Sequence, residues 1–198
     1  MTAAPDNEPG TRVLVNVLGH FDVWHGERDL TPPAGQGAAV VQLLALHDGV
    51  IHRDRLVAHL WPDDPPWVGQ QRLRNVLYRL RRHTGPLVGR DPRRNNLVRY
   101  TQPVRIDLTE FLHLSAEAIR LARSDPGAAI EHGTRALMLY RGPLLLDQPD
   151  AEWAHPPRIH ATERHRLLLH ALAEASDRLG EPEQATLYRH RGTRSYPS

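Results

Sequence analysis

The stretch from Trp67 to His83 limits the possible folds more than any other part of the chain. Prolines precede it at positions 62, 65 and 66, and Gly85 follows it. Within it, apolar residues recur at the i, i+3, i+4 and i+7 positions: Leu73, Val76, Leu77 and Leu80. This periodicity predicts one amphipathic helix, because prolines and glycine mark its two ends. Arginines occupy its polar side, so the fold must bury one face of the helix and expose a basic one.

Short predicted elements surround this helix. Before it, the residue pattern indicates strands at 13–19, 21–25 and 28–30 and helices at 38–47 and 52–61. After it, strands at 87–90 and 97–100 enclose a turn, 91–96, with two arginines at its tip. Helix, turn, basic helix and basic hairpin, in this order, form a winged helix-turn-helix.

The remainder of the chain is predicted to be helical. Four helices are expected, at 108–123, between Pro126 and Gly142, at 158–179 and at 183–191. Asp107 and Glu110 have the spacing of a capping box at the start of the first of them. Small residues such as Ala173 and Ala185, facing Tyr188, are typical of tetratricopeptide-like helix pairs, although an arbitrary helical bundle has them too. The fold class is therefore an α+β winged helix-turn-helix domain followed by an all-α tetratricopeptide-like domain.

Positive charge is concentrated in one segment. Residues 67–105 contain 10 arginines and a single acid, whereas residues 1–66 hold 4 arginines and 9 acids. Residues 106–198 hold 11 arginines and 13 acids, so the formal net charge of +2 hides a local charge of +9. Duplex DNA, with one phosphate per about 1.7 Å of its axis, is the natural partner of such a segment.

Several protein classes are excluded by what the sequence lacks. It contains neither cysteine nor lysine, which excludes thiol nucleophiles, disulfides, zinc–thiolate fingers and a lysine-bearing phosphate loop. No nucleophile elbow, HExxH motif or glycine-rich phosphate loop is present, so we expect neither an enzyme nor a bound cofactor. No apolar run reaches the roughly 20 residues of a membrane span, and the first ten residues are unlike a secretory signal. We therefore expect a cytoplasmic protein without membrane contact.

Thirteen histidines raise the question of a metal site. Four of them recur at every fifth position: His155, His160, His165 and His170. Five residues turn an α-helix by about 500°, so successive rings point about 140° apart and cannot share one ion. The sequence predicts no metal site.

Four motifs resemble, in order, those of a known family. They are Val17-Leu18-Gly19 with Phe21, Leu60 to Pro66 (LWPDDPP), Asn75 to Arg82 (NVLYRLRR) and Ala136 to Pro143 (ALMLYRGP). Together they span nearly the whole chain and resemble the Streptomyces antibiotic regulatory protein (SARP) family. The resemblance implies an OmpR-type winged helix joined to a tetratricopeptide-like bacterial transcriptional activation domain. One departure is Asn95-Asn96-Leu97, which stands where the family's wing usually has a Gly-Tyr-type strand start.

The resemblance also implies domain bounds and a function. We expect a disordered tail at 1–12, an OmpR-type winged-helix DNA-binding domain at 13–106 and a shortened tetratricopeptide-like activation domain at 107–198. The implied function is sequence-specific regulation of transcription, as an activator of a gene cluster for secondary metabolites such as antibiotics. Its implied partners are double-stranded DNA with repeated half-sites, a second copy of the chain in a homodimer, and RNA polymerase. The alternative is a protein-binding adaptor or a shortened competitor that cannot activate, but an adaptor has no need of the +9 segment.

The candidate DNA-binding residues lie on the basic helix and at the hairpin tip: Arg72, Arg74, Asn75, Tyr78, Arg79, Arg82, Arg93 and Arg94. Arginine reads guanine O6 and N7, and asparagine reads adenine N6 and N7. Asn75 and Arg79 match base-facing positions of OmpR-type recognition helices. Arg72 and Arg82 are expected to face bases or phosphates.

The other candidates have simpler roles. Arg93 and Arg94 are expected to contact phosphates or the minor groove. Arg74 is a phosphate contact or a plain surface residue. Tyr78 contacts a phosphate through its hydroxyl, or it packs against the protein.

The last two predicted helices bear on assembly. The chain stops at Ser198, soon after them, whereas the family's activation domain usually continues for several helices. The outer face of residues 158–191 then lacks a covering helix, and an exposed apolar face usually marks an interface. We expect this face to join a second copy of the chain. The alternative is that the tail at 191–198 caps the short stack and the chain is a monomer away from DNA.

Overall fold

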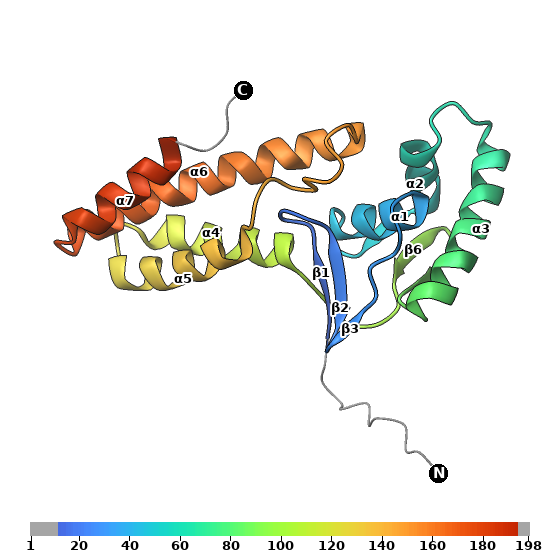
Figure 1. Ribbon diagram of the computed structural model, residues 1–198, viewed down its shortest axis with the longest axis horizontal. Coiled ribbons are helices and arrows are strands. Elements are labelled where there is room, and N and C mark those ends of the chain that lie inside the picture. Colours follow the sequence, from blue (N-terminus) through green and yellow to red (C-terminus); the bar gives the residue numbers. More distant parts are fainter. Residues whose placement is uncertain (1–11, 194–198) are drawn as a thin grey trace, which may run out of the picture. The chain divides into compact units, whose positions relative to one another are not determined.

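The structure is a computed structural model that describes residues 12–193 of the chain. These residues separate into two compact units (Figure 1). The first unit ends at residue 105 but omits residues 16–21; the second unit contains 16–21 and continues from residue 106. The tail expected at residues 1–12 lies, except for its last residue, outside the described part.

Strands and three helices make up the first unit. Its elements in chain order are β1 (Val13–Asn16), β2 (Asp22–His25), β3 (Arg28–Asp29), α1 (Gln36–Ala45), β4 (Val50–His52), α2 (Arg53–Leu60), α3 (Pro66–Thr84), β5 (Val88–Arg90), β6 (Leu97–Tyr100) and β7 (Val104–Ile106). The strands form two sheets, in the orders β3-β2-β1-β7 and β4-β6-β5. In the second sheet β6 runs antiparallel to both neighbours, and its pairing with β5 makes the hairpin that follows α3.

The core of the first unit centres on α1. Every residue from Ala38 to Ala45 is buried, which suits a helix that is apolar nearly all round. Tyr100 of β6 donates a hydrogen bond from its hydroxyl to the carbonyl oxygen of Val41, at 2.7 Å. Gly69 lets α3 approach α2 closely, because a Cβ at this position would lie 2.3 Å from the side chain of Val57. The close approach at Gly69 turns that face of α3 toward α2.

The second unit contains two pairs of helices. Its elements are α4 (Asp107–Leu121), α5 (Pro126–Leu139), the short 3-10 helix η1 (Glu152–Ala154), α6 (His155–Arg178) and α7 (Pro182–Thr193). The pairs α4–α5 and α6–α7 pack side by side (Figure 1). Small residues allow close packing, since a Cβ on Gly133 would lie 2.4 Å from Leu172. Ala173, Ala185 and Tyr188 are all buried, as the predicted tetratricopeptide-like packing requires.

Residues 16–21 are also part of the second unit, although they connect β1 with β2. The buried carboxylate of Asp107 accepts hydrogen bonds from the backbone N–H groups of Val17 and Leu18, each at 2.9 Å. The backbone N–H of Gly19 donates to Pro143, at 3.0 Å, and that of Leu145 donates to Val17, at 2.8 Å. The first unit is thus joined to the second by three chain crossings, at residues 15–16, 21–22 and 105–106.

The structure corrects the sequence reading of several helix and strand ends. Asp107 is not the N-cap of α4, which is Ile106. Its carboxylate accepts hydrogen bonds from residues 17 and 18 as well as from the backbone N–H of Leu108. The strand expected at 13–19 ends at Asn16 because residues 17 and 18 make these bonds instead. α6 begins at His155 rather than at 158, so Pro156 and Pro157 lie in its first turn. Prolines are tolerated there because the N–H groups of a first turn have no hydrogen-bond partner within the helix.

Candidate nucleic-acid interface

The exposed face of α3 is defined by the stripe opposite to it. Leu73, Val76 and Leu80 are buried against the rest of the first unit, together with Gly69 and Thr84. Successive helical residues are turned by about 100°, so Asn75, Tyr78 and Arg82 lie within about 40° of the line opposite this stripe. All three are exposed, and Tyr78 has 65% of its surface open to solvent. The Tyr78 ring is therefore not a packing residue of the core.

Arg72, Arg74 and Arg79 lie at the edges of this face. Arg74 is turned from its centre line by about 60°, and Arg79 and Arg72 by about 80° and 100°. All three are exposed. The guanidinium of Arg72 forms an ion pair with the carboxylate of Asp64, at 2.9 Å, which partly neutralises its charge.

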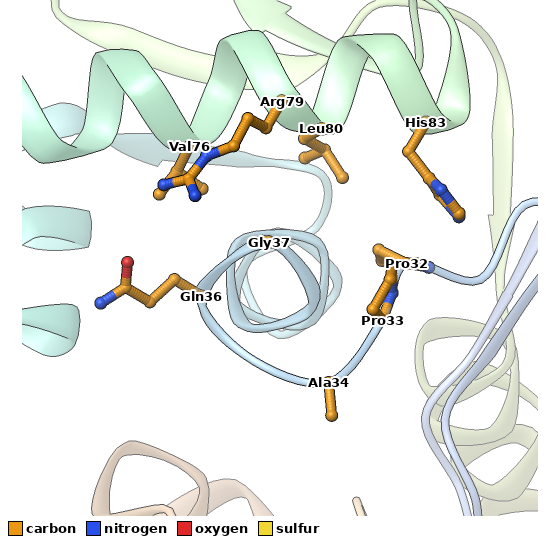
Figure 2. A pocket seen from close by; sticks show the side chains of 9 residues that line it. All are labelled: Pro32, Pro33, Ala34, Gln36, Gly37, Val76, Arg79, Leu80 and His83. Atoms are coloured by element: carbon orange, nitrogen blue, oxygen red, sulfur yellow. The ribbon is translucent and has the colours of Figure 1, made fainter.

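A cleft separates Arg79 from the first turn of α1. Figure 2 shows Arg79 reaching along α3 above the cleft and His83 pointing to its other end, beside Pro32 and Pro33. The ring nitrogen Nε2 of His83 lies 2.9 Å from the carbonyl oxygen of Thr31, which fixes that end. Arg79 thus lies over the cleft, along one side of the exposed face.

The hairpin β5–β6 holds Arg93 and Arg94 at its tip, where both side chains are exposed. Asp91 shapes the turn, because its Oδ1 accepts hydrogen bonds from the backbone N–H groups of both arginines, each at 2.9 Å. Its Oδ2 accepts a hydrogen bond from Arg99 at 3.3 Å. The backbone bonds from Arg93 and Arg94 hold the pKa of Asp91 below its usual range, and the Arg99 bond adds to this effect. The single acid of the basic segment is therefore used to build the turn.

Two residues of the same α3 face were missed by sequence reasoning. Gln71 lies almost directly opposite the buried stripe and is exposed. Trp67, in the first turn, is 70% exposed and lies about 40° from the same line. Extending the 100° periodicity to the first two turns would have found both of them.

Other kinds of site were also sought in residues 12–193. Within this range, His, Asp and Glu side chains do not gather in groups of three that could hold a metal ion. The four histidines spaced by five all lie on α6, and burial lowers the pKa of His165 to about 4. None of the helices described has both the length and the apolar character needed to cross a membrane.

The helical part of the chain matches a known protein family. Residues 106–198 match the bacterial transcriptional activator domain (BTAD) family. The helices of the second unit are therefore similar to a bacterial transcriptional activator domain. No curated protein matches the chain in sequence.

The activator domain has a structural relative with a similar N-terminal part. The chain is similar to Mycobacterium tuberculosis EmbR, solved in complex with a low-affinity phosphopeptide, with a TM-score of 0.57 and 18% sequence identity. The match covers 92% of this chain and 59% of EmbR, so the chain spans about three fifths of that protein. The predicted fold class, a winged helix-turn-helix followed by an all-α tetratricopeptide-like domain, is confirmed. The match over residues 106–198 also supports the resemblance to SARP-type transcriptional regulators.

Proposed function

We propose that the chain binds double-stranded DNA in a sequence-specific manner and regulates transcription. α3 lies in the major groove, where an α-helix fits, and the β5–β6 hairpin contacts the neighbouring phosphates or minor groove. Asn75 and Arg79 read base edges, and Arg72, Arg74, Tyr78 and Arg82 contact bases or phosphates from the same helix. Arg93 and Arg94 contact the backbone or the minor groove from the hairpin tip.

The observation that carries this proposal is the separation of apolar and basic surfaces on α3 and the hairpin. Leu73, Val76 and Leu80 are buried, whereas every arginine of α3 and of the hairpin tip is exposed. The one acid of residues 67–105 is turned into the hairpin, toward backbone N–H groups and Arg99. A surface with this charge, on a helix followed by a hairpin, matches the groove and the phosphates of DNA.

The finer parts of the proposal rest on the family. From the resemblance to SARP-type regulators, we infer that the chain activates a gene cluster for secondary metabolites. It acts in the bacterial cytoplasm on DNA with repeated half-sites. The resemblance also implies contact with RNA polymerase through the activator domain. A homodimer is supported by Leu179 and Leu187, which are 45% and 46% exposed at the α6–α7 pair. The domain bounds proposed with this function are 13–106 for the winged helix and 107–198 for the activator domain.

Salt dependence tests the proposal most directly. If about 5 to 8 arginines contact phosphates, as many counterions are released on binding, and the log–log slope of affinity against salt is roughly −4 to −7 per monomer. Fluorescence anisotropy with a duplex obtained by binding-site selection from random sequence measures this slope. A flat salt response, or no enrichment of any sequence in the selection, would contradict DNA binding.

A further inference from the structure

His52 occupies an unusual position for a histidine. It is the last residue of β4 and the N-cap of α2, a place where serine, threonine, aspartate and asparagine are preferred. Its ring nitrogen Nδ1 accepts a hydrogen bond from the backbone N–H of Asp54, at 3.3 Å. His52 thus caps α2 as a serine or aspartate would. The second nitrogen of its ring, Nε2, can form a further hydrogen bond.

That second nitrogen reaches the hairpin. Nε2 of His52 lies 2.9 Å from the side-chain amide of Asn96. A neutral imidazole has one accepting and one donating nitrogen, and since Nδ1 accepts, Nε2 donates. The Asn96 atom at this distance is the amide nitrogen Nδ2. A half-turn of the amide, whose two ends have the same shape, places its oxygen there instead, where it accepts the hydrogen bond from Nε2. A serine or aspartate at position 52 is too short to make both contacts.

Asn96 is the last residue of the turn that carries Arg93 and Arg94. The turn is closed by hydrogen bonds from the backbone N–H of Asp91 to Leu97, at 3.0 Å, and from that of Leu97 to Arg94, at 2.9 Å. The backbone N–H of the residue after His52 also donates to the carbonyl oxygen of Asn96, at 2.7 Å. The junction of β4 and α2 therefore makes two hydrogen bonds with Asn96, one through the backbone and one through the His52 ring.

We propose that His52 and Asn96 form a tether that positions Arg93 and Arg94 for DNA. This inference rests on the proposed DNA-binding function and adds two positioning residues that do not themselves touch DNA. Holding a turn in its bound conformation lowers the entropy lost on binding. The tether also joins the hairpin to α2, the helix against which α3 packs, so the two proposed DNA-binding elements keep a fixed relation.

The variant His52→Ser separates tethering from capping. Serine is a preferred N-cap, so the bond to Asp54 persists, while the contact with Asn96 is lost. The matched variant Asn96→Ala removes the same contact from the other side and leaves the backbone bond in place. We expect each variant to lose about 2- to 10-fold in affinity for the selected duplex, the range of one net hydrogen bond. Thermal unfolding of the His52→Ser chain should stay close to wild type.

A double-mutant cycle supplies the readout that a merely structural role would not move. In a chain that already carries Arg93→Ala and Arg94→Ala, the tether has nothing to position, and His52→Ser should then change affinity by less than about twofold. Hydrogen exchange should also be faster at Leu97 in both tether variants.

The outcomes separate the two proposals. Wild-type affinity in both tether variants overturns the inference while leaving DNA binding intact. Equal losses with and without the two arginines overturn it as well, because His52 would then act elsewhere. A wild-type chain that binds no duplex refutes the proposed function itself, and faster exchange at Leu97 in the variants would still support the tether.

Discussion

At the scale of the residue, arginines with the same charge have different partners. Arg72 faces the carboxylate of Asp64. Arg158 donates hydrogen bonds to three backbone carbonyl oxygens of the loop after α5, and it fixes that loop without any acid. Arg82 and Arg94, in contrast, are exposed on α3 and on the hairpin. Counting arginines therefore indicates a polyanion partner, but only the surroundings of each side chain indicate its role.

Arg79→Ala and Arg94→Ala should have distinguishable effects on DNA binding. Arg79 reaches from the edge of α3, so its loss should cost about 1 to 3 kcal/mol on the best site and relax the preference at one base pair. Arg94 lies in the hairpin turn, and its loss should weaken binding to all sequences evenly and reduce the salt slope by about 1. Affinities for the selected site and its single-base variants measure both. Uniform losses for Arg79→Ala would show that it contacts only the backbone.

His165 should make the stability of the chain depend on pH. Its ring stacks on Tyr140, with the ring centres 4.0 Å apart, and burial, followed by the charge of Arg191, lowers its pKa to about 4. The unfolded chain takes up this proton near pH 6.5 and the folded chain only near pH 4. Stability from this group is therefore complete above pH 6.5 and falls as the pH drops toward 4, by about 1 to 2 kcal/mol after allowance for solvent screening.

Urea unfolding at pH 7 and pH 4.5 tests this effect. His165→Phe keeps an aromatic ring beside Tyr140 and should flatten the pH dependence. His170→Gln, at an exposed position of the same helix, is the matched control and should leave it unchanged. If both variants follow the wild-type curve, His165 does not carry the dependence. The lowered pKa of His59 contributes equally in all three chains.

At the scale of the element, long periodic segments were predictable, whereas two of the three-residue strands were not. The periodicity of residues 67–83 gave α3 to within one residue at each end, because its buried and exposed faces differ over five turns. β4 and β7 were missed, since three residues are too few to show alternation and both strands depend on pairing with distant residues. The same holds for the candidate site. The helix period predicts which side of α3 its arginines occupy, whereas the His52–Asn96 contact could not be predicted because the two residues are 44 positions apart in the sequence.

Gly69 sets the distance between α2 and α3. Alanine at this position would bring a methyl group within 2.3 Å of the Val57 side chain. We expect Gly69→Ala to destabilise the chain by about 1 to 3 kcal/mol, although alanine itself favours helices. Gly37→Ala in α1 is the matched control, because its nearest neighbour would lie at 3.9 Å, and it should be neutral or stabilising. Denaturant unfolding measures both, and recovery in the Gly69→Ala, Val57→Ala double variant would identify the clash as the cause.

At the scale of the whole molecule, the open question is assembly. Ala185 and Tyr188 of α7 pack inward, whereas Leu187 and Leu179 are exposed at the α6–α7 pair. We expect replacement of both leucines by glutamate to shift a dimer toward monomer, because burying a charge at an interface is costly. Sedimentation at micromolar concentrations measures the shift. Met138→Glu, at an exposed position of α5, is the control and should leave the dimer unchanged. A wild-type chain that remains monomeric both alone and on paired sites would refute the dimer.

The placement of residues 16–21 has a consequence for hybrid regulators. Exchanging activator domains between related proteins by a single junction near residue 106 would replace Asp107, Pro143 and Leu145 but keep the host's residues 16–21. The incoming carboxylate would keep its bonds from Leu108 and Arg141, but it would depend on a foreign segment for the bonds that Val17 and Leu18 donate to it in this chain. A functional graft must therefore carry two separate pieces of sequence, and a chimera cut once should fold only when host and donor agree in both.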